Sequence, residues 1–329
     1  MMNYILQIQN PAAASAEPHF KPGQVWNDTN GQPINAHGGG LLSYGGLYYW
    51  YGEFKIAGKE GNKAQVGVSC YSSSDLYTWK YEGIVLPVSE EPNHDIARGC
   101  ILERPKVIYN KKTGKFVMWF HLELLGEGYN SARVGVAISD SVTGPFIFQE
   151  SFRPDGAMAR DLTLFVDQDE TAYLFAASDD NRTMHVSRLR DDYLQTSGQH
   201  TQIFADRYME APAVFRHNGR YYFVGSGCTG WAPNAARSAV ADSIWGPWQE
   251  LQNPCVGPDS ELTFGAQSTY VLPIAGRSDA FIFLADRWTP ANPIDGRYVW
   301  LPITFTAGGF EIRWHDEWDL DTFPDKTNA

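Results

Sequence analysis

Five polar residues recur along the chain, each standing just before a short run of apolar residues. They comprise three carboxylates, one imidazole and one amide: His37, Glu103, Asp161, Glu210 and Gln267. Scattered surface positions would not be expected to give such a set at equivalent points of a repeat. Clustered carboxyl groups are what the cleavage of a glycosidic bond requires, because one of them must protonate the leaving oxygen.

The segments that follow these residues resemble one another. HGGGLLSYGGLYYWYG from His37 aligns with EAPAVFRHNGRYYFVG from Glu210, with the Gly-containing turns and the Tyr-Tyr pairs in register. Three further segments share this plan: ERPKVIYNKKTGKFVMWF, DLTLFVDQDETAYLFAA and QSTYVLPIAGRSDAFIFLA. Each apolar run is short, rich in β-branched and aromatic residues, and bounded by Gly, Asn or Asp, which is typical of strand-turn-strand units.

Further strand-like segments follow the hairpins, such as VGVSCYSSSDLYTWKY and AARSAVADSIWGPWQE, so each repeat is expected to form a four-stranded blade. Five such blades can close around a central channel and leave only short, protected edges. We therefore expect an all-β, five-bladed β-propeller over residues 26–329, preceded by an N-terminal extension at residues 1–25. The innermost strands of a propeller begin at one rim, so the five polar residues should face one pocket.

The composition narrows the choice of partner. The 329 residues carry a net charge of -12, include 14% aromatic residues and contain no run of Lys and Arg. Nucleic acids and anionic membranes require basic patches, so we expect neither as a partner, whereas the aromatic surplus suits neutral sugars. No apolar run approaches the length of about 20 residues that spans a bilayer. The amino terminus has a short apolar stretch but no basic region, and is at best a damaged signal peptide.

The cysteines and the acidic clusters point to no metal. The four cysteines lack the paired spacing of a zinc site and are interpreted as buried thiols: Cys70, Cys100, Cys228 and Cys255. The segments DQDE and SDDN lack the spacing of a calcium-binding EF-hand, and hairpin turns explain them more simply. We expect neither a metal site nor an organic cofactor.

The motifs NDTNGQPINAHGGGLL, YYWYGE, ERPKVIYN, RDLTLFVD, EAPAVF and GAQSTYVLP together resemble glycoside hydrolase family 43, most closely its branch of exo-β-1,3-galactanases. The resemblance covers nearly the whole chain. It implies that Glu210 is the general acid. It also implies that Asp161 raises the pKa of Glu210 and orients it.

One position departs from the family pattern. Most members begin the first blade with an Asp that serves as the general base, and this chain has His37 there. The branch resemblance implies that Gln267 holds the attacking water, with Glu103 binding the sugar or assisting as base. A neutral amide is a poor base, so the identity of the base stays open between Gln267 with Glu103 and a neutral His37.

Four residues are expected to bind the substrate. The resemblance implies that Glu53 recognises sugar hydroxyls, and Asn181 lies in a loop that could do the same. Trp231, in GSGCTGWAPN, is expected to stack on a sugar ring, the alternative being a place in the propeller core. His37 is expected to hydrogen-bond a sugar hydroxyl unless it is the base.

These observations together predict an exo-acting, inverting hydrolase that removes galactose from β-1,3-galactan. Two alternatives remain: an α-L-arabinofuranosidase or β-xylosidase of the same family, because pocket loops set which sugar fits, and a non-catalytic carbohydrate-binding propeller. We expect an oligo- or polysaccharide as the partner, a monomer in solution, and a secreted or periplasmic location, because polysaccharides do not readily enter a cytoplasm.

Overall fold

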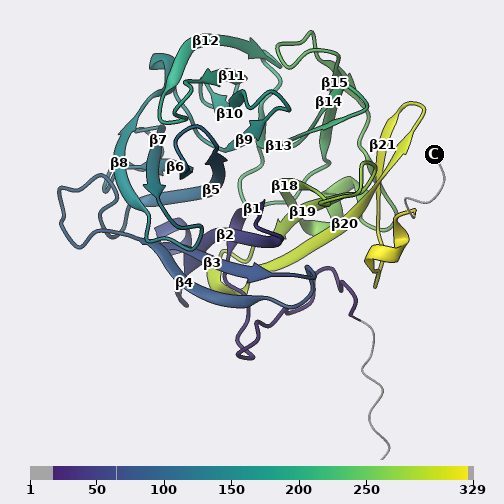
Figure 1. Cartoon of the computed structure of the whole chain (residues 1–329), viewed down its shortest axis with the longest axis horizontal. Coiled ribbons are helices and arrows are strands. Elements are labelled where there is room, and N and C mark those ends of the chain that lie inside the picture. The colour runs from purple at the N-terminus through teal and green to yellow at the C-terminus, as the bar shows by residue number, and fades with distance from the viewer. Residues whose placement is uncertain (1–17, 64, 325–329) are drawn as a thin grey trace, which may run out of the picture.

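Five antiparallel blades surround a central channel in the computed structural model, which describes residues 18–63 and 65–324 (Figure 1). The innermost strands contact one another around the channel and are β1 (His37–Tyr44), β5 (Ile101–Asn110), β9 (Leu162–Val166), β13 (Met209–His217) and β18 (Gln267–Pro273). The expected all-β, five-bladed β-propeller is confirmed.

Each blade adds further strands outward from the channel in sequence order. The second strands are β2 (Leu47–Lys55), β6 (Lys115–Glu123), β10 (Ala172–Ser178), β14 (Arg220–Gly227) and β19 (Phe281–Arg287). The third strands are β3 (Gln65–Ser73), β7 (Arg133–Ser139), β11 (Thr183–Leu189), β15 (Arg237–Ala241) and β20 (Arg297–Thr306). The outer strands are β4 (Lys80–Pro87), β8 (Ile147–Phe152), β12 (Thr196–Ile203), β16 (Gln249–Leu251) and β21 (Gly309–Arg313), with β17 (Cys255–Val256) pairing in parallel beyond β21.

Short 3₁₀ turns occur only between strands or after the last blade within the described residues. They are η1 (Gly61–Lys63), η2 (Pro154–Gly156), η3 (Ser260–Gly265), η4 (Pro293–Asp295) and η5 (Leu320–Thr322). No helix in this part of the chain is long and apolar enough to cross a membrane.

The apolar side chains pack between adjacent blades, as the alternation along each strand requires. One cluster lies between the first two blades, one between the second and third, one between the third and fourth, and the largest joins the fifth blade to the fourth and first. These layers bury both faces of the sheets and hold the start of every inner strand in a fixed place.

The segment before the first blade is tied to the segment after the last one. Phe20 and Trp318 exchange two backbone N–H···O bonds of 2.7 and 3.1 Å, and their rings stack with centroids 4.3 Å apart. Phe20 is only 2% exposed and lies in the largest core cluster. We call this pair the clasp. Residues 1–17 lie outside the described residues, and so does the proposed signal-peptide remnant, so the domain boundary at residue 25 stays a prediction.

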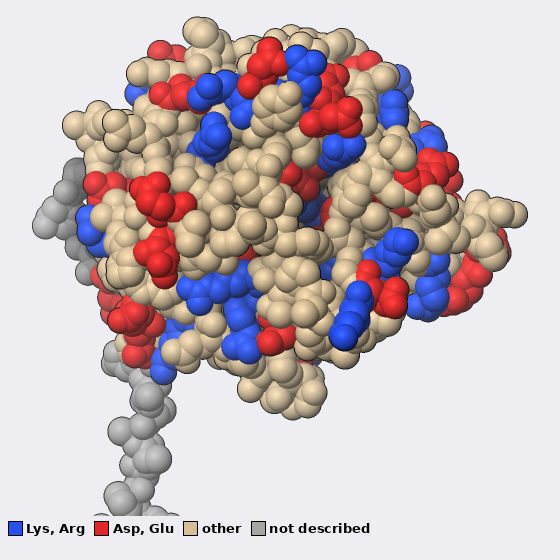
Figure 2. Space-filling model, turned by 180° about the vertical axis from the view of Figure 1, so that it is seen from behind, with Lys and Arg blue, Asp and Glu red and all other residues tan. Residues whose placement is uncertain are grey.

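Acidic and basic side chains are interspersed on the face seen from behind, and no broad basic patch interrupts them (Figure 2). A hollow near the centre of this face contains side chains of both signs (Figure 2).

Candidate active site

A cavity of about 350 Å³ lies where the inner strands begin. Four of the five residues at the blade starts line it, namely Glu103, Asp161, Glu210 and Gln267. The other lining residues are Glu53, Asn62, Arg104, His121, Tyr129, Arg160, Asn181, Cys228, Gly230, Trp231 and Trp288. The structure therefore brings together every predicted site residue except His37.

Three of the five blade starts are followed by a bulge in the backbone. The strand register shifts directly after His37, Glu103 and Glu210, and the next residue in each case has a left-handed φ: Gly38 at 60°, Arg104 at 53° and Ala211 at 55°. Bulges of this kind bend a strand and re-aim its side chains.

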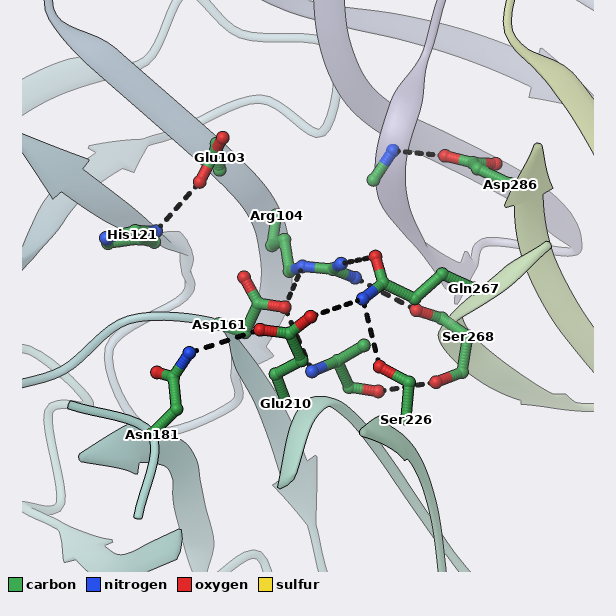
Figure 3. Close-up of polar contacts among 12 residues, drawn as sticks. Glu103, Arg104, His121, Asp161, Asn181, Glu210, Ser226, Gln267, Ser268 and Asp286 are labelled. Carbon is green, nitrogen blue, oxygen red and sulfur yellow. Dashed lines mark hydrogen bonds and ion pairs between the residues drawn. The ribbon is translucent and has the colours of Figure 1, made fainter. Parts of the chain in front are cut away.

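Glu210 is held between two amide groups (Figure 3). Asn181 Nδ2 donates to its Oε2 at 3.1 Å, and Gln267 Nε2 donates to its Oε1 at 2.9 Å. Burial and the neighbouring charge of Asp161 raise the pKa of Glu210 to about 7, against the opposing charge of Arg104. A carboxyl group in this environment keeps its proton at mildly acidic pH, as a general acid must.

Arg104 connects the residues around Glu210 (Figure 3). Its Nε lies 2.8 Å from Asp161 Oδ2, and its Nη2 donates to Gln267 Oε1 at 2.6 Å. Asp161 Oδ2 also accepts the backbone N–H of Ala211 at 2.9 Å. The guanidinium is nearly buried, so it fixes Asp161 beside Glu210 in one orientation.

Gln267 uses all the hydrogen-bonding capacity of its amide within the protein. Its Nε2 donates to Glu210 and, at 2.9 Å, to Ser226 Oγ. Its Oε1 accepts from Arg104 and, at 2.9 Å, from Trp288 Nε1. An amide has two donor hydrogens and two acceptor lone pairs, so a water on Gln267 must displace one of these contacts.

Glu103 lies on the opposite side of Asp161 from Gln267 (Figure 3) and accepts two hydrogen bonds. Tyr129 donates to its Oε1 at 2.9 Å, and His121 Nδ1 lies 3.0 Å from its Oε2. Burial would raise the pKa of Glu103, but the hydrogen bond and charge of His121 hold it down at about 2. Glu103 is therefore an ionised carboxylate at any ordinary pH.

His37 does not line the cavity and is completely buried. Its ring stacks on Tyr298 with centroids 5.5 Å apart, and burial lowers its pKa to about 3. The prediction that His37 contacts substrate or acts as base is wrong, because the imidazole is completely buried and is not among the residues that line the cavity.

Glu53 and Trp231 both line the cavity. Glu53 is 2% exposed. Its carboxylate pairs with Lys55 Nζ at 2.6 Å and accepts the backbone N–H of Arg104 at 3.0 Å. Trp231 is 42% exposed and packs edge-on against Trp288, with centroids 5.9 Å apart, so it is not part of the propeller core. Their sugar-binding roles, like that of Asn181, stay predictions.

Cys228 is exposed and lines the cavity, so the interpretation of all four cysteines as buried thiols is wrong for this one. The other three are buried, and none of the four forms a disulfide.

Glu103, His121 and Asp161 form the group of possible metal ligands found among the described residues, with ligand atoms within 4.8 Å of one another. Both ring nitrogens of His121 already face carboxylates, and Asp161 is bound by Arg104. A metal ion would have to break these contacts, so the cluster does not fit one.

Sequence reasoning missed Arg104, His121, Tyr129 and Trp288. Arg104 directly follows a blade start, but the repeat marks its neighbour Glu103 and not Arg104 itself. The others lie on second strands or loops, where the repeat gives no signal for them.

A five-bladed propeller with a proton-holding Glu, an adjacent Asp and a polar cavity at one end of its channel has the architecture of a glycoside hydrolase. The model of glycosyl hydrolases family 43 matches residues 41–309. The chain belongs to this family.

Solved structures of the family resemble the chain closely. A family 43 β-1,3-galactosidase solved with galactodeoxynojirimycin is 46% identical, with a TM-score of 0.88 over 92% of this chain and 100% of that one. An exo-β-1,3-galactanase from Phanerochaete chrysosporium, solved with β-1,3-galactotriose, is 36% identical, with a TM-score of 0.85 over 92% of this chain and 68% of that one. An exo-β-1,3-galactanase from Clostridium thermocellum is 36% identical, with a TM-score of 0.83 over 91% of this chain and 66% of that one.

A β-D-galactofuranosidase from Aspergillus niger is 24% identical over 202 residues, which make up 56% of this chain and 55% of that protein. The matched region thus spans about half the length of this curated relative.

Proposed function

We propose that this protein removes single galactose residues from the end of β-1,3-galactan with inversion at the anomeric carbon. The observation that carries the proposal is Glu210, a glutamate with a raised pKa beside Asp161 in the cavity. The nature of the sugar is supported by the β-1,3-galactosidase and exo-β-1,3-galactanases that the chain resembles over more than nine-tenths of its length.

In the proposed reaction, Glu210 protonates the glycosidic oxygen while a water attacks the anomeric carbon from the opposite face. Asp161, held by Arg104, keeps Glu210 protonated until the bond breaks. Gln267 and Glu103 position the water, Gln267 exchanges one of its present contacts for it, and the Glu103 carboxylate accepts the proton that the water loses. Glu53, Asn181 and Trp231 bind the sugar from three different blades.

The two alternatives differ in what they predict. An α-L-arabinofuranosidase or β-xylosidase would prefer nitrophenyl arabinosides or xylosides over galactosides in a direct comparison of kcat/KM. A non-catalytic binding propeller would hydrolyse none of them. The raised pKa of Glu210 argues against the binding propeller, because a lectin gains nothing from a buried carboxyl beside a second one.

The test of the mechanism is Glu210→Gln, which removes the proton donor and keeps the shape of the side chain. Activity on β-1,3-galactobiose should fall by about 10²- to 10⁴-fold, as expected for the loss of general acid catalysis. Aryl galactosides with good leaving groups need less protonation and should lose much less. Glu261→Gln, at an exposed glutamate outside the cavity, is the matched control. An equal loss on all leaving groups would overturn the role of Glu210.

The location and the oligomeric state belong to the same proposal. A polymer substrate favours a secreted or periplasmic enzyme, which fractionation of the native cells can test. We also propose a monomer, with no nucleic-acid or membrane partner, and light scattering can measure the mass in solution.

A further inference from the structure

A row of buried ionisable side chains begins at the cavity wall with Glu103 and His121 and ends at Glu123, which does not line the cavity. His121 stands on β6 with only 1% of its side chain exposed, and Glu123, two residues further on the same face of that strand, is fully buried. His121 Nδ1 lies 3.0 Å from Glu103 Oε2, and its Nε2 lies 2.9 Å from Glu123 Oε1. The second oxygen of Glu123 accepts the backbone N–H of Ala132 at 2.8 Å.

The chemistry of the ring fixes its protonation state in this arrangement. An ionised carboxylate only accepts hydrogen bonds, whereas a neutral imidazole has one donor and one acceptor nitrogen. Both nitrogens of His121 face carboxyl groups, so when both of these are ionised only the doubly protonated ring satisfies both contacts. The imidazolium charge balances that of the fully buried Glu123 and leaves the charge of Glu103 facing the cavity.

We propose that His121, anchored by Glu123, is a positioning residue that holds the Glu103 carboxylate in one orientation for the attacking water or a sugar hydroxyl. Glu103 cannot take that orientation from Tyr129 alone, because the tyrosine is 38% exposed and lies on a loop. This catalytic consequence rests on the proposed hydrolase function. The protonation state of His121 does not.

Other charged groups also face this row. Glu53 and Lys55 approach Glu103 from β2, Arg104 follows it on β5, and Asp161 approaches from the start of β9. Burial would lower the pKa of His121, but its contacts with Glu103 and Glu123 outweigh burial and raise the pKa to about 9. The charges of these groups therefore do not reverse the doubly protonated state of His121 that the hydrogen bonds indicate.

The first experiment needs no substrate. In the wild-type protein labelled with ¹⁵N-histidine, both nitrogens of His121 should carry protons up to about pH 8, well above the ordinary histidine pKa of about 6.5. His121→Gln assigns the signal by its disappearance. A His121 ring that titrates near the ordinary value would overturn the proposal, whether or not the protein hydrolyses galactan.

The second experiment measures kcat/KM against pH for His121→Gln and Glu123→Gln. Without the imidazolium, the pKa of the buried Glu103 should rise, so activity should be lost on the acid side. A carboxyl group whose pKa lies one unit above the assay pH is only about one-tenth ionised, so His121→Gln should lose about tenfold more activity at pH 4 than at pH 7. Glu123→Gln should shift the profile in the same direction and by less.

The control is His217→Gln, which removes a histidine with 9% of its side chain exposed that pairs with Asp279, at the opposite end of β13 from Glu210. Its pH profile should match that of the wild type. A loss in His121→Gln that is the same at every pH, with the melting temperature lowered as in the control, would show a purely structural role and overturn the proposal.

Discussion

Glu210 and Asp161 share one cavity, but they have different partners. Glu210 receives two amide donors and the Cys228 thiol, and burial and the charge of Asp161 raise its pKa. Asp161 instead receives a guanidinium and a backbone N–H. The two carboxyl groups are thus suited to separate acid and auxiliary roles.

This division predicts the basic side of the pH profile. Glu210 must be protonated to act, so kcat/KM should fall as the pH rises through its pKa of about 7. Asp161→Asn removes the charge that raises this pKa and leaves that of Arg104, so the basic limb should move to lower pH. The measurement is kcat/KM from pH 4 to 9 on β-1,3-galactobiose, with Asp140→Asn as a surface control. An unmoved limb in Asp161→Asn would refute the assignment.

The sequence predicted the residues at the blade starts but not the residues that hold them. Glu103, Asp161, Glu210 and Gln267 recur with the repeat and therefore could be found without coordinates. Arg104, His121 and Trp288 contact site residues on other segments of the chain. The repeat pattern does not show which segments come into contact. His37 had the right place in the repeat, but it packs against Tyr298 of the fifth blade, a contact that the repeat does not show.

Bulges follow three of the five blade starts, namely His37, Glu103 and Glu210. Each bulge places the following residue in the left-handed region, and two of these residues are Arg104 and Ala211 rather than glycine. Non-glycine residues seldom adopt this conformation, so the sequence gives little sign of it. The five blades could be predicted from strand patterns, whereas the re-aiming of their first residues could not.

Gly38 is the bulge residue whose missing side chain matters most. A Cβ there would lie 2.4 Å from Glu53 Oε1, whereas a Cβ at Gly45, which has the same φ of 60°, would meet nothing. Gly38→Ala and Gly45→Ala should therefore both lower the melting temperature, because the left-handed region costs alanine about 1–2 kcal/mol. Only Gly38→Ala should also displace Glu53 and reduce kcat/KM. Similar activities in the two variants would show that the position of Glu53 is unimportant.

Closure of the ring is a property of the whole molecule. Each blade is built from consecutive strands, and the segment before the first blade reaches the last one through the clasp of Phe20 and Trp318. Ion pairs of Glu317 with His19 and Lys21 flank the clasp, but they are largely exposed and add little. The buried Phe20 ring therefore supplies most of the stabilisation at this point.

Phe20→Ala should lower the free energy of unfolding by about 3–5 kcal/mol, the usual cost of removing a buried phenylalanine ring. Val25→Ala, at a residue of the same segment that is 51% exposed, should change it little. Urea unfolding followed by circular dichroism measures both. A cost for Phe20→Ala no larger than that of Val25→Ala would mean that the ring stays closed without the clasp.

The positions of the tryptophans allow the protein to be studied by its intrinsic fluorescence. Trp26, Trp50, Trp79 and Trp300 pack against one another near the clasp, with ring centroids 4.8 to 6.5 Å apart. Trp231 and Trp288 form a separate pair at the cavity, and Trp231 is open to water. Trp231 therefore adds a red-shifted, quencher-accessible contribution to the emission of the buried tryptophans, which include Trp119 between the second and third blades. A sugar seated on Trp231 should protect it from acrylamide, so binding can be followed in an unlabelled sample.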